Sequence, residues 1–558
     1  MLKKILFGIF ACIILGVSAL AVLTSMPGNE RVDPLTYFNE FKEGQLNVVY
    51  EDARVDMEKP IIQKGECLYV SYPFAREYID EKIYYDKIEQ IVTITNLQEL
   101  RRIVPGELRM VVNNEEQSLI TPFLVEEDEL YIPEDYLEEE YGIQIELGKD
   151  RRLVCVSDLK VQKPVGMIKK KEGKLRTHPD NKTLIVDEIE KGHKVIVYKE
   201  EDGYMRVRDE NGIIGFIPSK DVAVGEMTQL KQDKAYTLAK INKPIEGKVK
   251  LVWDQMTSRA TGDWSTPKYR NIHNANIIAP TWFEFEDESG KLMDRGSVAY
   301  VDAAHARGLQ VWALLSHNFT TPELTRTILT STNKRQYVID QVLEAARKYG
   351  FDGINIDIEN VQADFATEWI QFMRELSVQA KRNSVSVSVD VYIPSAWSAY
   401  YQRDKLAEVV DYFFVMAYDQ HWSGSEQAGP VAGLGWVEEG IRLNLEEVPK
   451  EKLVLGIPLY TRIWKETPEG LSSSAYGMAA SQSVINRWGA TAIYDDAHDQ
   501  SYVQKIEGDT MYHAWIEDAT VVEKRIKLID EYDLAGYAGW KLGLETSDVW
   551  HALAQMEE

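Results

Sequence analysis

One segment of the sequence places an amide and two carboxyl groups at alternate positions between isoleucines. It reads Phe351-Asp352-Gly353-Ile354-Asn355-Ile356-Asp357-Ile358-Glu359-Asn360. If the segment is a β-strand, side chains alternate between its two faces, so Asn355, Asp357 and Glu359 share one face. Carboxyl groups that lie close together and partly buried repel each other, which raises the pKa of one and keeps it protonated near neutral pH. Cleavage of a glycosidic bond needs such an acid, so the segment indicates glycosidase chemistry.

Eight short apolar runs, separated by amphipathic stretches, follow one another in residues 248–558. This alternation is typical of parallel strands joined by helices, and eight such units predict an α/β fold, the closed (β/α)8 TIM barrel. A doubly wound open sheet is the alternative, but no GxGxxG sequence follows the first run. The predicted strands are Val249–Trp253, Asn276–Pro280, Leu309–Leu315, Gly353–Ile358, Val385–Val391, Tyr412–Ala417, Leu453–Pro458 and Ala535–Trp540.

The fourth run carries the carboxyl groups, and Glu359 lies at its C-terminal end, where TIM-barrel enzymes place their sites. Polar groups in an apolar barrel interior cost free energy unless they are paired. An ion-pair network is the alternative, although no Lys or Arg on a neighbouring run is obviously placed to neutralise the acids. Residues 464–515 are too many for an ordinary connection, and we expect an inserted subdomain that forms one wall of a cleft.

Four patterns follow the order of the predicted strands. Residues 352–359 read DGINIDIE, 416–419 read MAYD, 456–460 read GIPLY and 539–540 read GW. The series resembles glycoside hydrolase family 18, the chitinase-like barrels, with their DGxDxDxE motif, their MxYD motif on the sixth strand, a seventh-strand motif and an eighth-strand tryptophan that floors the −1 sugar site. Asn355 stands where Asp is commoner in the family.

The resemblance implies a substrate-assisted retaining mechanism, an exception among glycoside hydrolases. Glu359 would protonate the glycosidic oxygen, while the sugar's own 2-acetamido carbonyl attacks the anomeric carbon. Asp357 would orient the acetamido group and stabilise the oxazolinium charge, and Tyr418 would hydrogen-bond the acetamido oxygen. Asn355 would support Asp357 by a hydrogen bond.

Other residues are expected to contact the substrate. Aromatic rings can stack on sugars, although packing in the core is the alternative for any tryptophan in a strand. For Arg462 the alternative is a solvent-facing place on the rim. The candidate substrate contacts are Asn355, Asp352, Asp419, Trp540, Met416, Tyr460, Arg462 and Trp282.

The resemblance implies a β-1,4-linked polymer of N-acetylglucosamine as substrate, either peptidoglycan, spore cortex or chitin. The alternative is a catalytically inactive barrel that binds cell-wall carbohydrate. Histidines are sparse, and no HExxH or other paired spacing occurs, so we predict no metal. The reaction needs no cofactor.

The first 29 residues resemble a targeting segment. Lys3 and Lys4 precede the twenty uncharged residues Ile5–Thr24, which suffice for a transmembrane helix. The lysines would remain in the cytoplasm, so a single-pass protein would expose its catalytic domain outside the cell membrane. A cleaved signal peptide is the alternative, because Ala19-Leu20-Ala21 resembles a cleavage site and would release the chain to the cell wall.

Residues 30–60 are predicted to be a polar, weakly structured stalk. Residues 61–160 contain a repeat, since Leu68-Tyr69-Val70 and Leu130-Tyr131-Ile132 lie 62 positions apart. We interpret it as a duplicated small α/β module, which resembles the N-terminal module of some copper amine oxidases and implies a spacer or binding role. Cys67 and Cys155 could form a disulfide only if the fold brings them together.

Residues 166–224 alternate apolar and polar side chains around turns such as Asp202-Gly203 and Asn211-Gly212. They resemble a bacterial SH3-like β-barrel, which either binds cell-wall peptide or acts as a spacer. Residues 225–247 are predicted to be a linker. The net charge is −26, from 63 Lys and Arg against 89 Asp and Glu, which argues against nucleic-acid binding. We expect a monomer.

Overall fold

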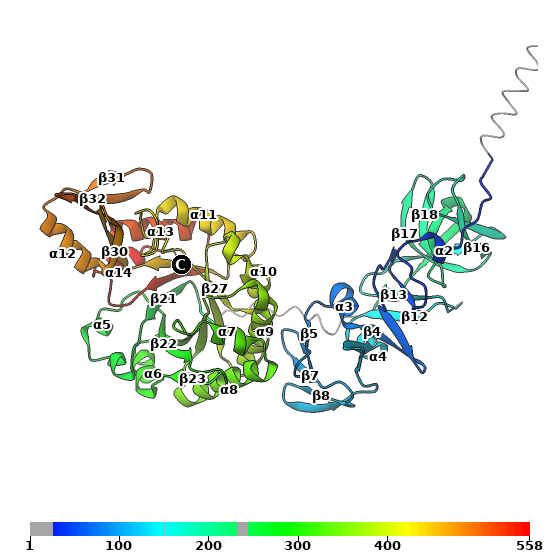
Figure 1. Cartoon of the computed structure of the whole chain (residues 1–558), viewed down its shortest axis with the longest axis horizontal. Coiled ribbons are helices and arrows are strands. Elements are labelled where there is room, and N and C mark those ends of the chain that lie inside the picture. Colours follow the sequence, from blue (N-terminus) through cyan, green and yellow to red (C-terminus); the bar gives the residue numbers. More distant parts are fainter. Residues whose placement is uncertain (1–25, 150, 232–243, 558) are drawn as a thin grey trace, which may run out of the picture. The chain divides into compact units, whose positions relative to one another are not determined.

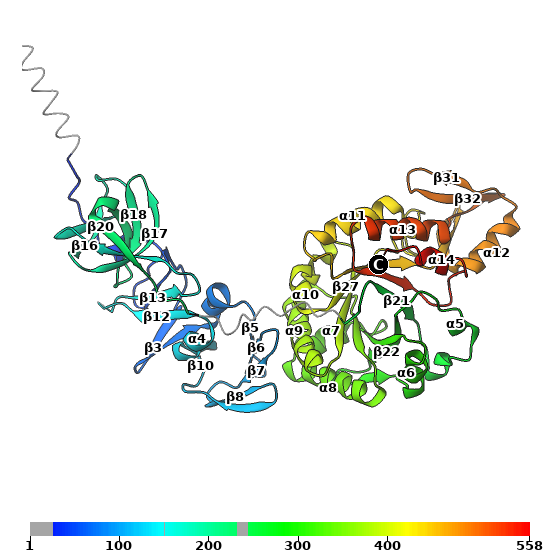
Figure 2. The same cartoon turned by 180° about the vertical axis from the view of Figure 1, so that it is seen from behind.

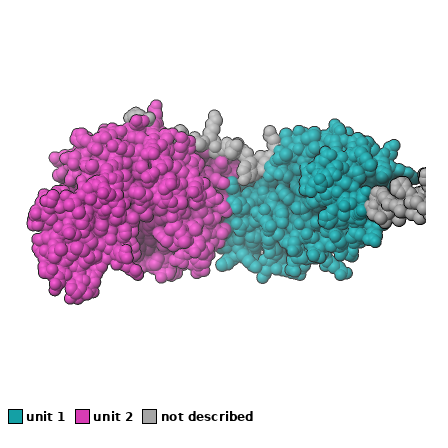
Figure 3. All heavy atoms as spheres, turned by 90° about the horizontal axis from the view of Figure 1, so that it is seen from above, with its two compact units in different colours: residues 1–94, 101–237 teal, residues 95–100, 238–558 magenta. Residues whose placement is uncertain are grey.

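The computed structural model describes residues 26–149, 151–231 and 244–557. The chain forms two compact units, residues 1–94 with 101–237 and residues 95–100 with 238–558 (Figure 3). The predicted membrane helix or signal peptide at Ile5–Thr24 lies outside the described residues. Within the described ranges, no helix is both long enough and apolar enough to cross a membrane.

The second unit contains a closed barrel of eight parallel strands (Figures 1 and 2). Each strand pairs with the next in chain order, and the first pairs with the eighth, which closes the ring. This confirms the predicted (β/α)8 architecture. The strands are β21 (Val249–Asp254), β22 (Ile277–Phe285), β24 (Gln310–Ser316), β25 (Gly353–Asp357), β26 (Ser386–Tyr392), β27 (Tyr412–Met416), β28 (Leu453–Pro458) and β34 (Gly536–Trp540).

Helices surround the barrel, as Figures 1 and 2 show from opposite sides. A short strand, β23 (Leu292–Asp294), pairs antiparallel with the end of β22. The helices are α5 (Pro267–Arg270), α6 (Val298–His305), α7 (Glu323–Leu329), α8 (Thr332–Tyr349), α9 (Ala366–Arg382), α10 (Arg403–Val409), α11 (Leu434–Leu445), α13 (Ala519–Glu531) and α14 (Val549–Leu553).

Alternation along β25 works as the sequence predicts. Ile354, Ile356 and Ile358 belong to the apolar layer between strands and helices, and all three are fully buried. A second apolar cluster fills the barrel interior, where Trp312 lies opposite Gly353. A Cβ atom on Gly353 would lie 2.7 Å from the Trp312 ring, so only glycine leaves room for this indole.

The predicted insertion is a separate small sheet that follows β28. Its five antiparallel strands pair in the order β30-β29-β33-β32-β31, and one helix follows β30. The insertion begins slightly earlier than predicted, at Tyr460. Its elements are β29 (Tyr460–Thr467), β30 (Gly470–Gly477), α12 (Met478–Trp488), β31 (Ile493–Asp495), β32 (Gln500–Glu507) and β33 (Thr510–Trp515).

The repeat in the first unit pairs with itself. Strands β4 (Cys67–Ser71) and β11 (Glu129–Pro133) are equivalent in the two copies and lie antiparallel in one sheet. Val70 pairs with Ile132, its counterpart 62 positions later, so the copies meet through matching strands. In each copy a short helical segment and a hairpin follow, β5–β6 in the first and β12–β13 in the second.

The other strands around the repeat form three sheets together with β4 and β11, and short helices accompany them. They are α2 (Pro34–Tyr37), β1 (Asn47–Tyr50), β2 (Ala53–Arg54), β3 (Ile61–Lys64), α3 (Tyr72–Phe74), β5 (Ile83–Asp86), β6 (Ile91–Thr95), β7 (Leu100–Ile103), β8 (Arg109–Val112), β9 (Glu115–Ser118), β10 (Leu124–Glu126), α4 (Glu134–Glu140), β12 (Ile143–Leu147) and β13 (Leu153–Asp158).

The predicted stalk over 30–60 is wrong in its second half. Strand β1 pairs parallel with β13, and Val48 and Val49 are fully buried. These apolar side chains make the segment part of the module's core rather than a solvated tether. Cys67 and Cys155 are thiols and are not joined in a disulfide, and burial raises the pKa of Cys67 to about 11.

Residues 164–227 form one antiparallel sheet of seven strands. Its last strand continues to Met227, so the predicted linker at 225–247 begins inside this sheet, and residues 232–243 lie outside the described ranges. The strands are β14 (Pro164–Ile168), β15 (Glu172–Arg176), β16 (Ile185–Glu190), β17 (Lys194–Glu201), β18 (Tyr204–Arg208), β19 (Ile214–Pro218) and β20 (Val222–Met227).

Candidate active site

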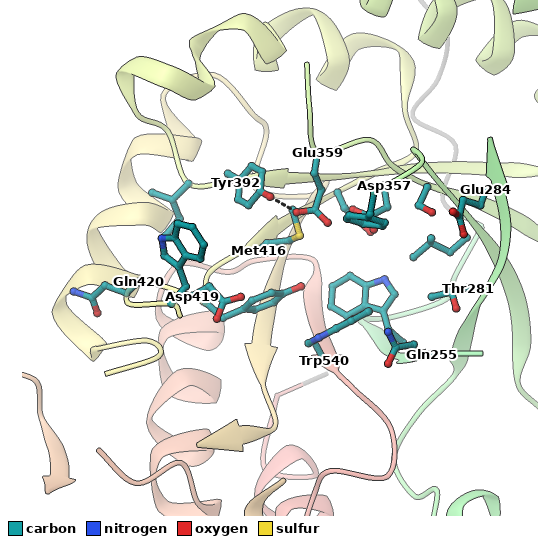
Figure 4. Close-up of a pocket in the computed structure, with 18 of the residues that line it drawn as sticks. Gln255, Thr281, Glu284, Asp357, Glu359, Tyr392, Met416, Asp419, Gln420 and Trp540 are labelled. Carbon is teal, nitrogen blue, oxygen red and sulfur yellow. Dashed lines mark hydrogen bonds between the residues drawn. The ribbon is translucent and has the colours of Figure 1, made fainter. Parts of the chain in front are cut away.

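A pocket of about 1110 Å³ opens at the C-terminal end of the barrel strands. Its lining includes the last residue of each of five strands, which shows that the pocket lies at the C-terminal end of the barrel. Figure 4 shows Asp357 beside Glu359 and the Trp540 indole across the pocket from them. The five strand-end residues are Ser316, Asp357, Tyr392, Met416 and Trp540.

The backbone that carries the two acids is held from both sides. Asp357 ends β25, and Glu359 follows two residues later. The Tyr401 hydroxyl donates to the Ile358 carbonyl at 3.0 Å. The Glu359 amide donates to Nδ1 of His317 at 3.3 Å, and burial lowers the pKa of His317, which keeps this ring nitrogen free to accept. Glu359 is therefore presented to the pocket by fixed backbone.

Among the described residues, no Lys, Arg or His forms an ion pair with Asp357 or Glu359, so burial dominates the electrostatics of these two acids, whereas Arg295 in the pocket lining pairs with Glu284 at 3.3 Å. Burial raises the pKa of Asp357 well above its usual range, and the charges of Glu359 and Asp390 add to this. Burial also raises the pKa of Glu359; the hydrogen bond donated by the Tyr392 hydroxyl to Oε2 opposes that rise, and Asp419 adds to it (Figure 4). A raised pKa favours the protonated form of a carboxyl group, and that form can act as an acid.

Asp357 has an unused acceptor. Its Oδ1 atom is buried and has no hydrogen-bond partner among the described residues, although Asp357 lines the pocket. A buried polar atom without a partner costs about 1–3 kcal/mol, so it favours a ligand that donates to it. An amide N–H held in the pocket would be such a donor.

Tyr418, Met416 and Trp540, all predicted for the site, line the pocket. Burial, with the neighbouring Asp390 and Asp357, raises the pKa of Tyr418 well above its usual value, so its hydroxyl remains a donor. The Trp540 ring lies 6.0 Å from that of Trp253, edge to face, at the bottom of the barrel opening. The site therefore combines a phenol donor with an aromatic surface.

Tyr460 and Arg462 act behind the pocket rather than in it. The Tyr460 hydroxyl donates to Oδ1 of Asp419 at 2.6 Å, and Nη2 of Arg462 lies 3.7 Å from the same oxygen. Asp419 lines the pocket, whereas none of the insertion's residues 460–515, all of which the structure describes, borders it. The structure thus corrects the expectation that the insertion forms one wall of the cleft. The insertion instead contacts Asp419 from behind, and the ends of the barrel strands and the loops that follow them line the pocket.

Asn355 lies beneath the pocket and has no exposed surface. Its Oδ1 accepts from the Trp253 indole, and its Nδ2 donates to Ser388 and Asp390. The structure therefore corrects two expectations for this residue. It cannot reach a substrate, and its partner is Asp390 rather than Asp357.

Asp352 and Trp282 are also misplaced by the sequence reasoning. Asp352 precedes β25, at the opposite end of the barrel, where it accepts from the Val311 amide and pairs with His305 at 2.8 Å. Trp282 is fully buried in the outer layer, where its indole packs against Tyr300 and Phe351. Neither can contact a ligand in the pocket.

The sequence reasoning missed Asp390, Tyr392 and the exposed rings of Trp397 and Trp422, which all line the pocket. A signal for the first two was present. Strand β26 reads Ser-Val-Ser-Val-Asp-Val-Tyr, so its polar side chains share one face in the same way as those of β25. Trp397 lies in a short 3-10 helix, Ala396–Tyr401, and Trp422 lies in a loop, and no periodicity in the sequence reveals where these two rings point.

Comparison with known families matches two parts of the chain. Residues 316–545 match the family described as glycosyl hydrolases family 18, and residues 49–156 match the copper amine oxidase N-terminal domain. The first match covers β25 to β34 and so includes both acids and Tyr418. The second begins in the segment predicted as a stalk, in agreement with the position of β1.

Among curated proteins, an uncharacterized glycosylase, YvbX, of Bacillus subtilis is 25% identical over 302 residues, which are 52% of this chain and 86% of that protein. A cortical fragment-lytic enzyme of the same organism is 26% identical over 241 residues, 42% of this chain. The chain spans only 56% of that enzyme's length.

The fold recurs in solved structures. The spore cortex-lytic enzyme SleL of Bacillus megaterium superposes with a TM-score of 0.50 at 19% identity. The superposition covers 56% of this chain and 74% of that one. At this identity the match supports the barrel fold alone.

Proposed function

We propose that the chain is a glycoside hydrolase that cleaves β-1,4 bonds in polymers that contain N-acetylglucosamine, since residues 316–545 match the glycosyl hydrolases family 18. The observation that carries this proposal is the pair of acids, Asp357, which is buried, and Glu359, which is partly buried. The raised pKa of Glu359 favours its protonated form at the pocket surface, and Asp357 beside it offers an acceptor that has no partner among the described residues. An acetylated amino sugar needs both groups.

In the proposed reaction, Glu359 gives its proton to the glycosidic oxygen as the bond to the anomeric carbon breaks. The carbonyl oxygen of the sugar's 2-acetamido group forms the new bond to that carbon from the other face, giving an oxazolinium ion. Water then opens this ion and returns a proton to Glu359. The anomeric configuration is retained because two displacements occur.

The other residues hold the acetamido group in line. Oδ1 of Asp357 accepts from the acetamido N–H, and the partial negative charge on that oxygen stabilises the positive charge that develops beside it. Tyr418 donates a hydrogen bond from its hydroxyl group to the acetamido oxygen, and the sugar ring stacks on the Trp540 indole. The reaction uses no cofactor.

We propose peptidoglycan or spore cortex as the polymer, rather than bulk chitin. The similarity to a cortical fragment-lytic enzyme supports this choice. The antiparallel sheet at 164–227 would serve as an SH3-like module that binds cell-wall peptide, and the segment Ile5–Thr24 would export the chain and anchor it at the membrane or be cleaved.

The test compares wild type with Glu359→Gln on chitooligosaccharides and on purified peptidoglycan. Release of reducing ends is measured, with circular dichroism to show that both proteins are folded. We expect activity from wild type on at least one polymer and almost none from the variant. An inactive wild type would support the alternative, a carbohydrate-binding barrel, and an active variant would show that the acid is misassigned.

A further inference from the structure

The pocket holds a third buried acid, Asp390, that the proposed reaction does not use. Asp390 lies on β26, lines the pocket and is 2% exposed. Among the described residues, no Lys, Arg or His forms an ion pair with it. A buried carboxyl group without a cation costs free energy, so its retention needs an explanation.

Asn355 is fixed so that its amide faces this acid. The Trp253 indole N–H, which can only donate, forms a hydrogen bond of 2.8 Å to Oδ1 of Asn355. The amide nitrogen must therefore point the other way, where it donates to Oδ1 of Asp390 at 2.7 Å and to Ser388 at 3.0 Å. The parallel register pairs Asn355 with Ser388 and so brings β25 and β26 together at this point.

The two aspartates near this amide differ in their partners. Asp390 accepts a hydrogen bond from Asn355, whereas Oδ1 of Asp357 accepts none from the described residues. A donor stabilises a carboxylate, and two adjacent carboxylates do not both ionise readily in a buried site. Burial raises the pKa of both aspartates, but the hydrogen bond from Asn355 opposes the rise for Asp390 and no hydrogen bond opposes it for Asp357. Of the two, Asp390 is therefore the one on which negative charge is favoured, and Asp357 is the one on which a proton is favoured.

We propose that Asp390 is a positioning residue of this enzyme, whose single negative charge, held by Asn355 beneath the sugar site, sets the protonation of Asp357 and Glu359. The inference rests on the proposed function, since those two acids are its catalytic pair. It assigns the pairing of Asn355 with Asp390 a role in the reaction rather than in folding.

The groups that face Asp390 leave its charge without a counterion. From β25 these are Asn355, Asp357 and the following Glu359, and from β21 and the end of β27 they are the neutral Trp253 and Tyr418. Ser388 and Tyr392 lie on its own strand, two positions away on either side. Each titratable group in this set is an acid or a phenol, so a negative charge on Asp390 favours their protonated forms.

The test is Asp390→Asn, which keeps the shape and removes the charge. We expect kcat to fall about tenfold or more and the pH profile of kcat to move to lower pH, because Asp357 and Glu359 then ionise more easily. Ser388→Ala is the matched control, since it removes a neutral partner of the same amide and keeps the charge. It should leave the pH profile where it is in wild type.

A charge swap separates charge from structure. In Asn355→Asp with Asp390→Asn, the carboxylate moves to β25, where it can accept from Trp253 and from the new amide. We expect this double variant to regain at least about tenfold of the lost kcat and the wild-type pH profile. A wild-type profile in D390N, or a folded double variant no better than D390N, would overturn the proposal.

A third measurement depends neither on the folding of a variant nor on enzymatic activity. Carbon-13 NMR of the wild-type aspartate carboxyl groups should show Asp390 ionised at a pH at which Asp357 is still protonated. The reverse order would overturn the proposal even if D390N does not fold. An inactive wild type with the expected order would contradict the proposed function and leave the charge assignment standing.

Discussion

The barrel contains two kinds of buried acid. In the helical layer, Glu375 on α9 lies 3.0 Å from Arg335 on α8, and both side chains have no exposed surface. Glu517 and Arg525 form a second pair of this kind at 2.6 Å. In the pocket, Asp357 and Asp390 are buried and Glu359 is partly buried, but the partners of their carboxyl oxygens among the described residues are a tyrosine, an asparagine or nothing.

The difference separates structural acids from acids that can exchange protons. An arginine keeps its carboxylate ionised and fixes it by charge-assisted hydrogen bonds, so that removal of either partner leaves an isolated buried charge. Neutral partners leave the carboxyl group free to hold a proton and release it. Burial alone would therefore not have distinguished the two sets, whereas the presence of a cation does.

The largest expected effect comes from the pocket. Glu359→Gln removes the group placed to protonate the leaving oxygen, so kcat/KM should fall about 10²- to 10⁴-fold. Because glutamine does not have to be neutralised on burial, the midpoint of thermal unfolding should not decrease. A variant that loses activity only because it unfolds would contradict the assignment, and calorimetry on the same sample reveals that outcome.

The matching change in the helical layer should have the opposite result. Glu375→Gln leaves Arg335 buried without its counterion, and the free energy of unfolding should fall by about 3–5 kcal/mol. Urea denaturation measures this loss. Activity per folded molecule should stay near that of wild type, and a loss below about 1 kcal/mol, the usual size for an exposed pair, would remove the distinction between the two kinds of acid.

A smaller effect should follow from Tyr392→Phe. The hydroxyl donates to Glu359 and so holds the pKa of this acid lower than burial alone would place it. Without it, kcat should fall about tenfold, which corresponds to roughly 1.4 kcal/mol, and the alkaline limb of the pH profile should move to higher pH. A shift of that limb to lower pH would show that the hydrogen bond acts on the protonated form.

The smallest effect concerns the pH dependence of stability. The pKa of Asp357 is raised in the folded chain, so the folded state binds more protons than the unfolded state above a pH of about 4. This contribution is present at low pH and is lost as the pH rises through the folded pKa. The introduced asparagine cannot ionise, so the free energy of unfolding of the Asp357→Asn variant should not decrease over this pH range. The difference in unfolding free energy, variant minus wild type, should therefore rise with pH, by about 1.4 kcal/mol for each pH unit between the unfolded and the folded pKa of Asp357.

Denaturation at several pH values measures that relative stability. Glu375→Asp, which keeps an ionised acid beside Arg335, is the control, and its stability relative to wild type should change little over the same range. A flat difference for Asp357→Asn would mean that Asp357 titrates normally in the folded chain.

The fold and the acids could be predicted from the sequence because both depend on local alternation. Residues 353–358 follow the period of a strand, so the isoleucines had to face the helices and the acids the barrel interior. The same reasoning, applied to β22, would have placed Trp282 in the outer layer with Ile278 and given the inner position to Thr281.

The partners of the acids could not be predicted in this way. Asp390 meets Asn355 because β25 and β26 pair in one particular register, and Tyr460 meets Asp419 across 41 positions of the chain. Such contacts depend on the tertiary fold. Short-range pattern also could not show that the insertion leaves the pocket open, because that depends on the direction in which its sheet departs from β28.

The central claim is that burial without a cation keeps a proton on Glu359. Carbon-13 NMR titration of the glutamate carboxyl groups tests it directly, with the Glu359 signal assigned by its absence in E359Q. We predict that this carboxyl group titrates clearly above about 4.3, the ordinary pKa of glutamate. Titration at or below that value would contradict the account, because Glu359 would then be ionised when the sugar needs its proton.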